Sequence, residues 1–171
     1  MLFKSDVQKD VKKILKSFAG IRKYKVLSDV TVEYKGKSAH IDQMMVGYFG
    51  VLFVSAYNLK KASLFGGENE DKWAVVKDDK KEHIPNFHKQ NLAFNAFLRD
   101  IFSSEKIYSI PFENAVCIKC KDDIKQINAN VNSMNILTLK QLKKHIRKVK
   151  FEKDLGVDVD KIVNCIEKYR K

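Results

Sequence analysis

One stretch of the sequence combines a carboxylate with polar side chains at the end of a buried strand. His40 to Asn58 predicts two strands joined at Gly47–Gly50, and Asp42 is the carboxylate of the first. The second begins with Val51–Val54, an apolar run typical of a central strand covered on both faces. Polar side chains then return at Ser55, Tyr57 and Asn58. A carboxylate facing such side chains predicts a metal or phosphate site, and the alternative is that Asp42 is only a turn or edge residue.

The net charge of the chain indicates a class of partner. Lys and Arg number 33 against 21 Asp and Glu, which gives +12 at pH 7. A field of this sign attracts polyanions, and nucleic acid is the commonest polyanion in a cell. A Lys-rich proteome is the alternative source of the charge, and an anionic membrane surface is a weaker candidate partner.

Length and composition limit the classes of protein to consider. A chain of 171 residues predicts one domain, which buries about 70% of its unfolded surface. The 44% apolar content with only 7 Gly and 2 Pro argues against disorder. The longest apolar run is far shorter than the ~20 residues that span a bilayer, and no signal peptide is evident. We expect a cytoplasmic protein with no membrane contact and no small-molecule substrate.

The order of the predicted elements is that of an α/β protein. Apolar residues at helical spacing predict helices near residues 5–18 and 87–102, a basic helix over 138–149 and a last helix capped by Asp158. Apolar runs predict strands at residues 24–27, 30–34, 40–42, 51–54, 73–76, 110–120 and 135–137. Residues 60–71 are expected to form a polar loop, and residues 77–82 a charged turn. This order predicts a central mixed sheet flanked by helices.

Short local motifs predict some of the element boundaries. Ser5 and Gln8 have the spacing of a capping box at the start of a helix, as do Thr138 and Gln141. Tyr34–Lys37 reads Tyr-Lys-Gly-Lys and predicts a tight hairpin turn.

The cysteines have the spacing of metal ligands but lack partners. Cys117 and Cys120 form one Cys-x-x-Cys pair, whereas a structural zinc site needs two further ligands. None of the four histidines lies near this pair in the sequence. We therefore expect a buried strand here and no zinc site.

Taken together, these pieces resemble the NERD family, the nuclease-related domain of the restriction-endonuclease-like PD-(D/E)xK superfamily. The most specific pieces are His40–Gln43 (His-Ile-Asp-Gln), Gly50–Val54 (Gly-Val-Leu-Phe-Val) and Gln90-Asn91, in this order. Further matching pieces are the opening helix, Val26–Val30, Asn58, the spacing from Gly66 to Trp73, Ala115–Cys120 and Ile136–Ile146. The resemblance implies a nuclease-related domain over residues 1–150, with residues 151–171 forming a C-terminal helix packed on it.

The resemblance also implies a chemistry. In this superfamily an Asp and a Glu bind Mg²⁺, a Lys two residues after the Glu helps to activate water, and a Glu of the first helix often assists. The metal polarises the phosphate and lowers the pKa of its bound water. Here the Asp falls on Asp42, but the Glu and the Lys fall on Ser55 and Tyr57, and the helix Glu falls on Gln8, which the capping box also explains. The resemblance thus implies remnant catalytic positions at Asp42, Gln43, Ser55, Tyr57, Gln8 and Gln90.

Three functional hypotheses remain open at this point. The first is a catalytically degenerate nuclease fold that binds nucleic acid, with Asp42 as a weak or absent metal site and no cofactor. The second is an active Mg²⁺-dependent DNA endonuclease whose catalytic groups have migrated to neighbours of Asp42. The candidates for migration are Glu33, His40, Lys60, Lys61 and Glu68. The third is a regulatory subunit with a protein partner.

Binding of nucleic acid, with DNA as the expected form, would depend on basic side chains. Lys and Arg contacts to phosphate give salt-sensitive affinity that is independent of sequence. The candidates lie on the first helix, after the central strand, on the second helix and on the basic helix: Lys9, Lys12, Lys13, Lys16, Lys60, Lys61, Lys89, Lys143, Lys144 and Arg147. The alternative is that these charged faces are only solvated.

Overall fold

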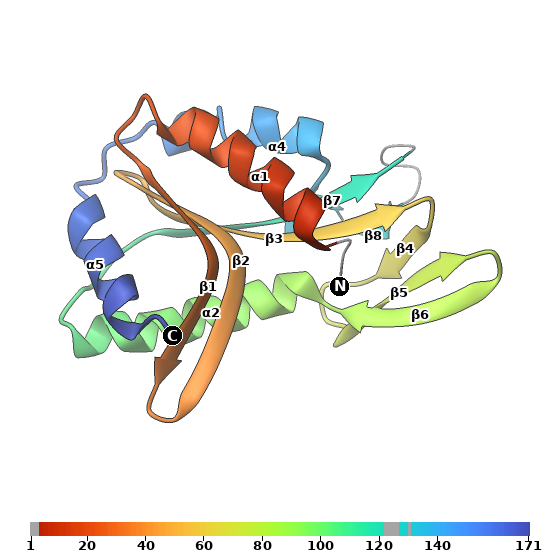
Figure 1. Cartoon of the computed structure of the whole chain (residues 1–171), viewed down its shortest axis with the longest axis horizontal. Helices are drawn as coiled ribbons and strands as arrows, with labels where there is room; N and C mark the ends of the chain where they lie inside the picture. Colours follow the sequence, from red (N-terminus) through yellow and green to blue (C-terminus); the bar gives the residue numbers. More distant parts are fainter. Residues whose placement is uncertain (1–3, 122–126, 130) are drawn as a thin grey trace.

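The described part of this computed structural model, residues 4–121, 127–129 and 131–171, contains two mixed sheets and helices (Figure 1). The larger sheet has the strand order β1-β2-β3-β7-β9, and the smaller has the order β6-β5-β4-β8. The strands are β1 Lys25–Tyr34, β2 Lys37–Gly47, β3 Gly50–Lys60, β4 Ser63–Gly66, β5 Lys72–Lys77, β6 Lys80–Pro85, β7 Phe112–Cys120, β8 Ile127–Ala129 and β9 Ile136–Leu137. The helices are α1 Lys4–Ala19, α2 Phe87–Ser104, α3 Val131–Met134, α4 Leu139–His145, the 3₁₀ turn η2 Val149–Phe151 and α5 Val159–Tyr169. The predicted mixed α/β class is confirmed, although the strands form two sheets where one was expected.

Helices cover both faces of the larger sheet. Residues of α1 and α4, such as Leu15 and Leu142, pack with Leu52 of β3 on one face. Residues of α2 and α5, such as Leu98 and Ile162, pack on the other face. The central strand β3 pairs antiparallel with β2 and parallel with β7, and its first residues are fully buried. The prediction of a central strand covered on both faces is therefore confirmed.

Strands β1 and β2 form the hairpin that the Tyr-Lys-Gly-Lys turn predicts. Tyr34 pairs with Lys37, and both turn residues, Lys35 and Gly36, have positive φ, as a two-residue hairpin loop requires. The two short strands expected at residues 24–27 and 30–34 are one continuous strand. Its regular pairing with β2 is interrupted at Asp29, which has φ of 54°.

The smaller sheet departs most from the sequence-based expectation. Strand β4 lies inside the segment expected to be a loop, and the charged turn is the centre of the β5–β6 hairpin, with positive φ at Asp78 and Asp79. Strand β6 reads Lys-Lys-Glu-His-Ile-Pro, and all but one of its side chains are exposed. An edge strand that buries almost nothing lacks the apolar alternation by which strands are recognised.

The helix caps were predicted with mixed success. Thr138 and Gln141 form the reciprocal capping box before α4, and Asp158 caps α5. The basic helix ends at His145, earlier than expected. The capping box predicted for Ser5 and Gln8 involves the Ser5 side chain, which lies outside the described residues, while the Gln8 amide nitrogen donates to Asp42.

Two further features follow from the fold. Cys117 lies on β7 as expected, and burial raises the pKa of its thiol to about 12. Within the described residues, no helix is both long enough and apolar enough to cross a bilayer.

His145, the last residue of α4, is buried with its ring against Phe151 at a centroid distance of 5.4 Å. Burial, assisted by Lys148 and Lys150, lowers its pKa from 6.5 to about 4. The unfolded chain therefore binds a proton here at a higher pH than the folded chain does. Stability is unaffected above pH 6.5 and falls as the pH drops from 6.5 towards 4.

We expect His145 alone to make the unfolding free energy about 1–3 kcal/mol lower at pH 4 than at pH 7. His145→Phe retains an aromatic ring against Phe151 and removes the titrating group. Urea unfolding of both proteins at the two pH values measures the difference. An identical loss of stability in acid for both proteins would contradict the assignment.

Candidate functional site

Asp42 is the centre of the candidate site, and it is a buried carboxylate whose two oxygens both accept hydrogen bonds. The side-chain amide nitrogen of Gln8 donates to Oδ1 at 2.8 Å. The backbone N–H of Ala56 donates to Oδ2 at 3.0 Å. Asp42 is only 3% exposed, so these donors offset the cost of removing the carboxylate from water.

Three elements bring these groups together. Helix α1 packs on the larger sheet through Val7 and Val11, and this places Gln8 over Asp42. The regular pairing of β2 with β3 ends at Gln43 and Val54, and beyond that point the two strands separate (Figure 1). The Asp42 carboxylate accepts the Ala56 N–H where the ladder stops. The site therefore lies where β2 and β3 diverge beneath α1.

A histidine and a second carboxylate complete the surroundings of Asp42. His40 Nε2 lies 3.4 Å from Asp42 Oδ1 and 3.3 Å from Asp29 Oδ1, while its Nδ1 lies 3.0 Å from Thr31 Oγ1. Asp29 is largely exposed, whereas His40 is partly covered. The imidazole is thus positioned between two carboxylates, one buried and one exposed.

Asp29 was not among the predicted site residues, although the sequence contained a signal for it. In a hairpin in which Tyr34 pairs with Lys37, each step back along β1 matches one step forward along β2. This register places Asp29 opposite Asp42. The carboxylates proposed as migrated ligands lie elsewhere. Glu33 pairs with Lys171 at 2.8 Å, and Glu68 lies 3.7 Å from His88.

Ser55 and Gln43 are buried and hydrogen-bonded to neighbours of the site. The Ser55 hydroxyl donates to Asn91 Oδ1 on α2, and the Asn91 amide donates to the carbonyl of Ala115 at 3.1 Å. Gln43 accepts a hydrogen bond from Ser28 at 2.7 Å. Ser55 therefore connects β3 with α2.

Tyr57 belongs to an aromatic cluster. Its ring lies 5.5 Å from that of Phe87, which also contacts Trp73. Burial, with a smaller effect from Glu82, raises the pKa of its hydroxyl above 10. A neutral phenol at this position supplies none of the positive charge that a Lys would bring.

The two predicted site residues of α2, Lys89 and Gln90, do not reach the site, whereas their neighbour Asn91 does. Gln90 is exposed, whereas its neighbour Asn91 is fully buried and reaches Ser55. Helical spacing from Phe94 and Leu98 would have placed Asn91 on the inner face. Lys89 donates to Asp71 at 2.8 Å and lowers the pKa of that carboxyl.

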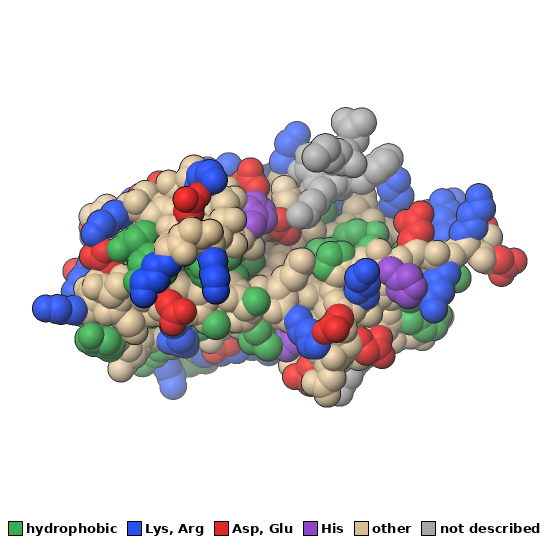
Figure 2. All heavy atoms as spheres, turned by 90° about the horizontal axis from the view of Figure 1, so that it is seen from below, with side chains coloured by type: hydrophobic (Ala, Val, Ile, Leu, Met, Phe, Trp, Pro, Cys, Tyr) green, Lys and Arg blue, Asp and Glu red, His purple; other side chains and the backbone are tan. Residues whose placement is uncertain are grey.

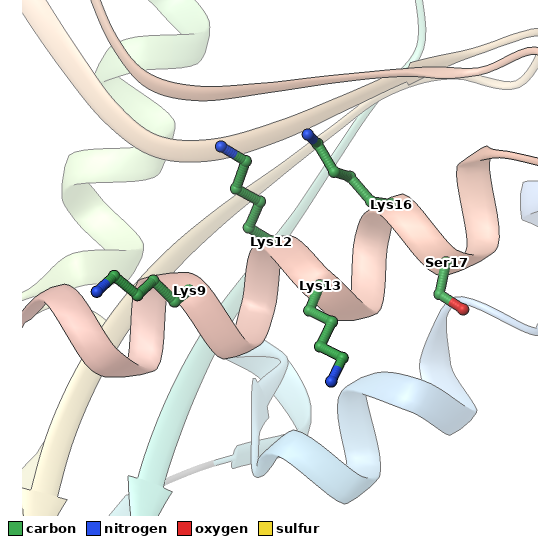
Figure 3. A pocket seen from close by; sticks show the side chains of 5 residues that line it. All are labelled: Lys9, Lys12, Lys13, Lys16 and Ser17. Carbon is green, nitrogen blue, oxygen red and sulfur yellow. The ribbon is translucent and has the colours of Figure 1, made fainter.

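The other predicted cations lie in three places. Lys60, with φ of 54°, and Lys61 are exposed where β3 ends. Four lysines of α1 line an open hollow of about 500 Å³ (Figure 3): Lys9, Lys12, Lys13 and Lys16, together with Ser17. Lys143, Lys144 and Arg147 are exposed on α4 and immediately after it.

The donors around Asp42 can be compared with those that a divalent cation needs. Mg²⁺ requires several oxygen ligands, usually including more than one carboxylate or the phosphates of a substrate. Around Asp42 stand two N–H donors and an imidazole, and N–H groups repel a cation. Across the residues that the structure describes, no group of three His, Cys, Asp or Glu side chains is arranged to hold a metal ion.

Comparison with known proteins relates this site to a family. The family model NERD, the nuclease-related domain, matches residues 5–119, the span from α1 into β7. This span contains every position to which the resemblance assigned a catalytic role. No match was found among curated proteins or among solved structures.

Proposed function

The chain belongs to the nuclease-related domain family, and on this premise we propose that it is a nucleic-acid-binding domain whose catalytic centre is closed by internal hydrogen bonds. In this proposal no divalent cation is held at Asp42, no phosphodiester is cut, and the basic side chains supply the affinity for nucleic acid.

The observation that carries the proposal is the hydrogen bond from Gln8 to Asp42, at 2.8 Å. Two carboxylates at this separation repel each other unless a proton or a cation lies between them. An amide in place of one carboxylate brings its own donor, so the pair is satisfied without any ion. The amide nitrogen of Gln8 therefore takes the role that a metal ion has between two acidic ligands.

The other two substitutions support the same proposal. The hydroxyl of Ser55 is bonded to Asn91, and Tyr57 is packed on Phe87 with a raised pKa. Neither side chain supplies a carboxylate ligand or an ammonium group to a reacting phosphate. Each replaced position has a packing or hydrogen-bonding role, as expected where stability has replaced catalysis.

The proposal predicts binding without cleavage. A fluorescent duplex of about 20 base pairs should bind the protein, and log affinity should fall linearly with log salt. Anisotropy titrations at several salt concentrations measure this slope, and gels of the same samples with Mg²⁺ or Mn²⁺ show whether the duplex stays intact. Cleavage that depends on the metal would favour an active nuclease, and neither binding nor cleavage would favour a protein partner.

A further inference from the structure

Helices α1 and α4, which are more than a hundred residues apart in the sequence, lie side by side on one face of the larger sheet (Figure 1). Both bury residues in the same cluster, Val11 and Leu15 from α1 with Leu142 and Ile146 at α4. Because their inner sides share one core, their outer sides form one continuous surface. We call this surface the α1–α4 face.

The α1–α4 face concentrates positive charge. Its cations are Lys9, Lys12, Lys13 and Lys16 on α1, with Lys140, Lys143, Lys144, Arg147 and Lys148 on or just after α4. Helix α4 contains no acidic residue. On α1, Asp10 is paired with Lys119, and Asp6 is exposed in the first turn. Within the described residues, none of these nine cations forms an ion pair with a carboxylate.

The rest of the surface is different. Elsewhere some lysines are paired with acids, as in Lys89–Asp71, Lys168–Glu105 and Lys171–Glu33. Others, such as Lys80 and Lys81, form no ion pair within the described residues. Figure 2, which views the molecule from the side away from α1, shows Lys and Arg interspersed with Asp and Glu around a hollow. The α1–α4 face therefore differs from the face in Figure 2 in the small number of acidic side chains among its cations.

The geometry of this face suits a run of phosphates. Lys9 to Lys16 are spaced along α1 over roughly 10 Å of helix rise. Lys13 points towards α4, whereas Lys12 and Lys16 point to the other side of α1 (Figure 3). Like charges three or four residues apart destabilise a helix, so a bound polyanion relieves a repulsion that the free protein carries.

The structure points to a duplex as the occupant. Surfaces that bind single strands present exposed aromatic rings on which bases stack. The aromatic rings beneath this face, Phe18, Phe49 and Phe151, are buried under the helices. We propose that the α1–α4 face binds the phosphate backbone of double-stranded nucleic acid, away from the Asp42 site. This inference rests on the proposed function and assigns it a surface and a form of ligand.

A pair of charge reversals tests the assignment. Lys13→Glu/Lys143→Glu changes one exposed lysine on each helix. We expect it to weaken binding of a 20-base-pair duplex by about tenfold or more at low salt, and to make the salt slope about two units less steep. Lys80→Glu/Lys81→Glu on exposed β6 makes the same change of net charge and should weaken binding by about twofold or less. Melting curves and circular dichroism confirm that both variants fold.

The outcomes separate this inference from the proposed function. Equal losses in the two variants would mean that binding follows net charge alone, and would overturn the surface assignment while leaving nucleic-acid binding intact. Tighter binding of a single strand of the same sequence would overturn the duplex assignment. DNA and RNA duplexes of one sequence share the phosphate backbone, and their relative affinities show which of the two nucleic acids the face binds more tightly. No duplex binding by the unaltered protein, with binding to phosphatidylserine vesicles instead, would overturn both proposals.

Discussion

Gln8→Glu should lower the unfolding free energy at pH 7 by about 1–3 kcal/mol, because it places a second carboxylate against buried Asp42. The new pair has no hydrogen between its oxygens unless one of them is protonated. The folded variant therefore takes up a proton more readily than the unfolded chain does. The difference in unfolding free energy between the variant and the parent should therefore become smaller as the pH falls and larger as the pH rises.

The same variant should gain a response to divalent cations. Two carboxylates are better ligands for Mg²⁺ or Mn²⁺ than a carboxylate and an amide, and binding to the folded state alone raises the melting temperature. Melting curves with and without millimolar Mn²⁺ measure the effect. Gln90→Glu is the matched control, because it makes the same chemical change at an exposed position and should show neither effect. A Gln8→Glu protein as stable as the parent at pH 7, and indifferent to metal, would contradict the role given to Gln8.

Asp42→Asn should cost about 1–3 kcal/mol, because it replaces the charged acceptor of two hydrogen bonds with a neutral amide, and the Gln8 amide must turn over to accept from the new nitrogen. Adding Gln8→Glu to this variant reverses the direction of the hydrogen bond between the two side chains. The amide at position 42 can then donate to the carboxylate at position 8 and accept from the Ala56 N–H. We therefore expect the double variant to be more stable than the sum of the single changes predicts, by about 1–3 kcal/mol.

Denaturant unfolding of the parent, the two single variants and the double variant completes the cycle. It requires no nucleic acid or metal, so it tests the geometry of the site separately from its function. Strictly additive losses would show that the two side chains are not coupled. That result would remove the structural argument for a closed catalytic centre.

Periodicity in the sequence was sufficient to predict the elements that bury an apolar face. Helices α1 and α2 were predicted near their observed limits, and β3 was predicted in its apolar first half, because each buries a regular set of apolar side chains. Strand β6 was missed because all but one of its side chains are exposed, and only Ile84 packs on the apolar cluster beneath it. An edge strand of this kind leaves little trace in the composition.

The sequence named Asp42 as the centre of a candidate site, but it did not predict the contacts of Asp42. Asp42, Ser55 and Tyr57 were identified from the order of motifs, but their partners depend on packing between distant segments. Gln8 was assigned to a local cap, whereas its amide reaches Asp42, 34 residues away. Local motifs compete with tertiary contacts that no short window of sequence contains. The joining of α1 with α4 into one basic face depends on the shared core in the same way.

Cleavage measured on duplex already bound by the protein tests the central claim most directly. A labelled duplex held at saturating protein concentration and low salt, with Mn²⁺, removes weak binding as a reason for inactivity. The account predicts a shifted complex that releases intact duplex after prolonged incubation, for the parent and for Asp42→Ala alike. Strand breaks that appear in the parent with Mn²⁺, and that are abolished by EDTA and by Asp42→Ala, would contradict it.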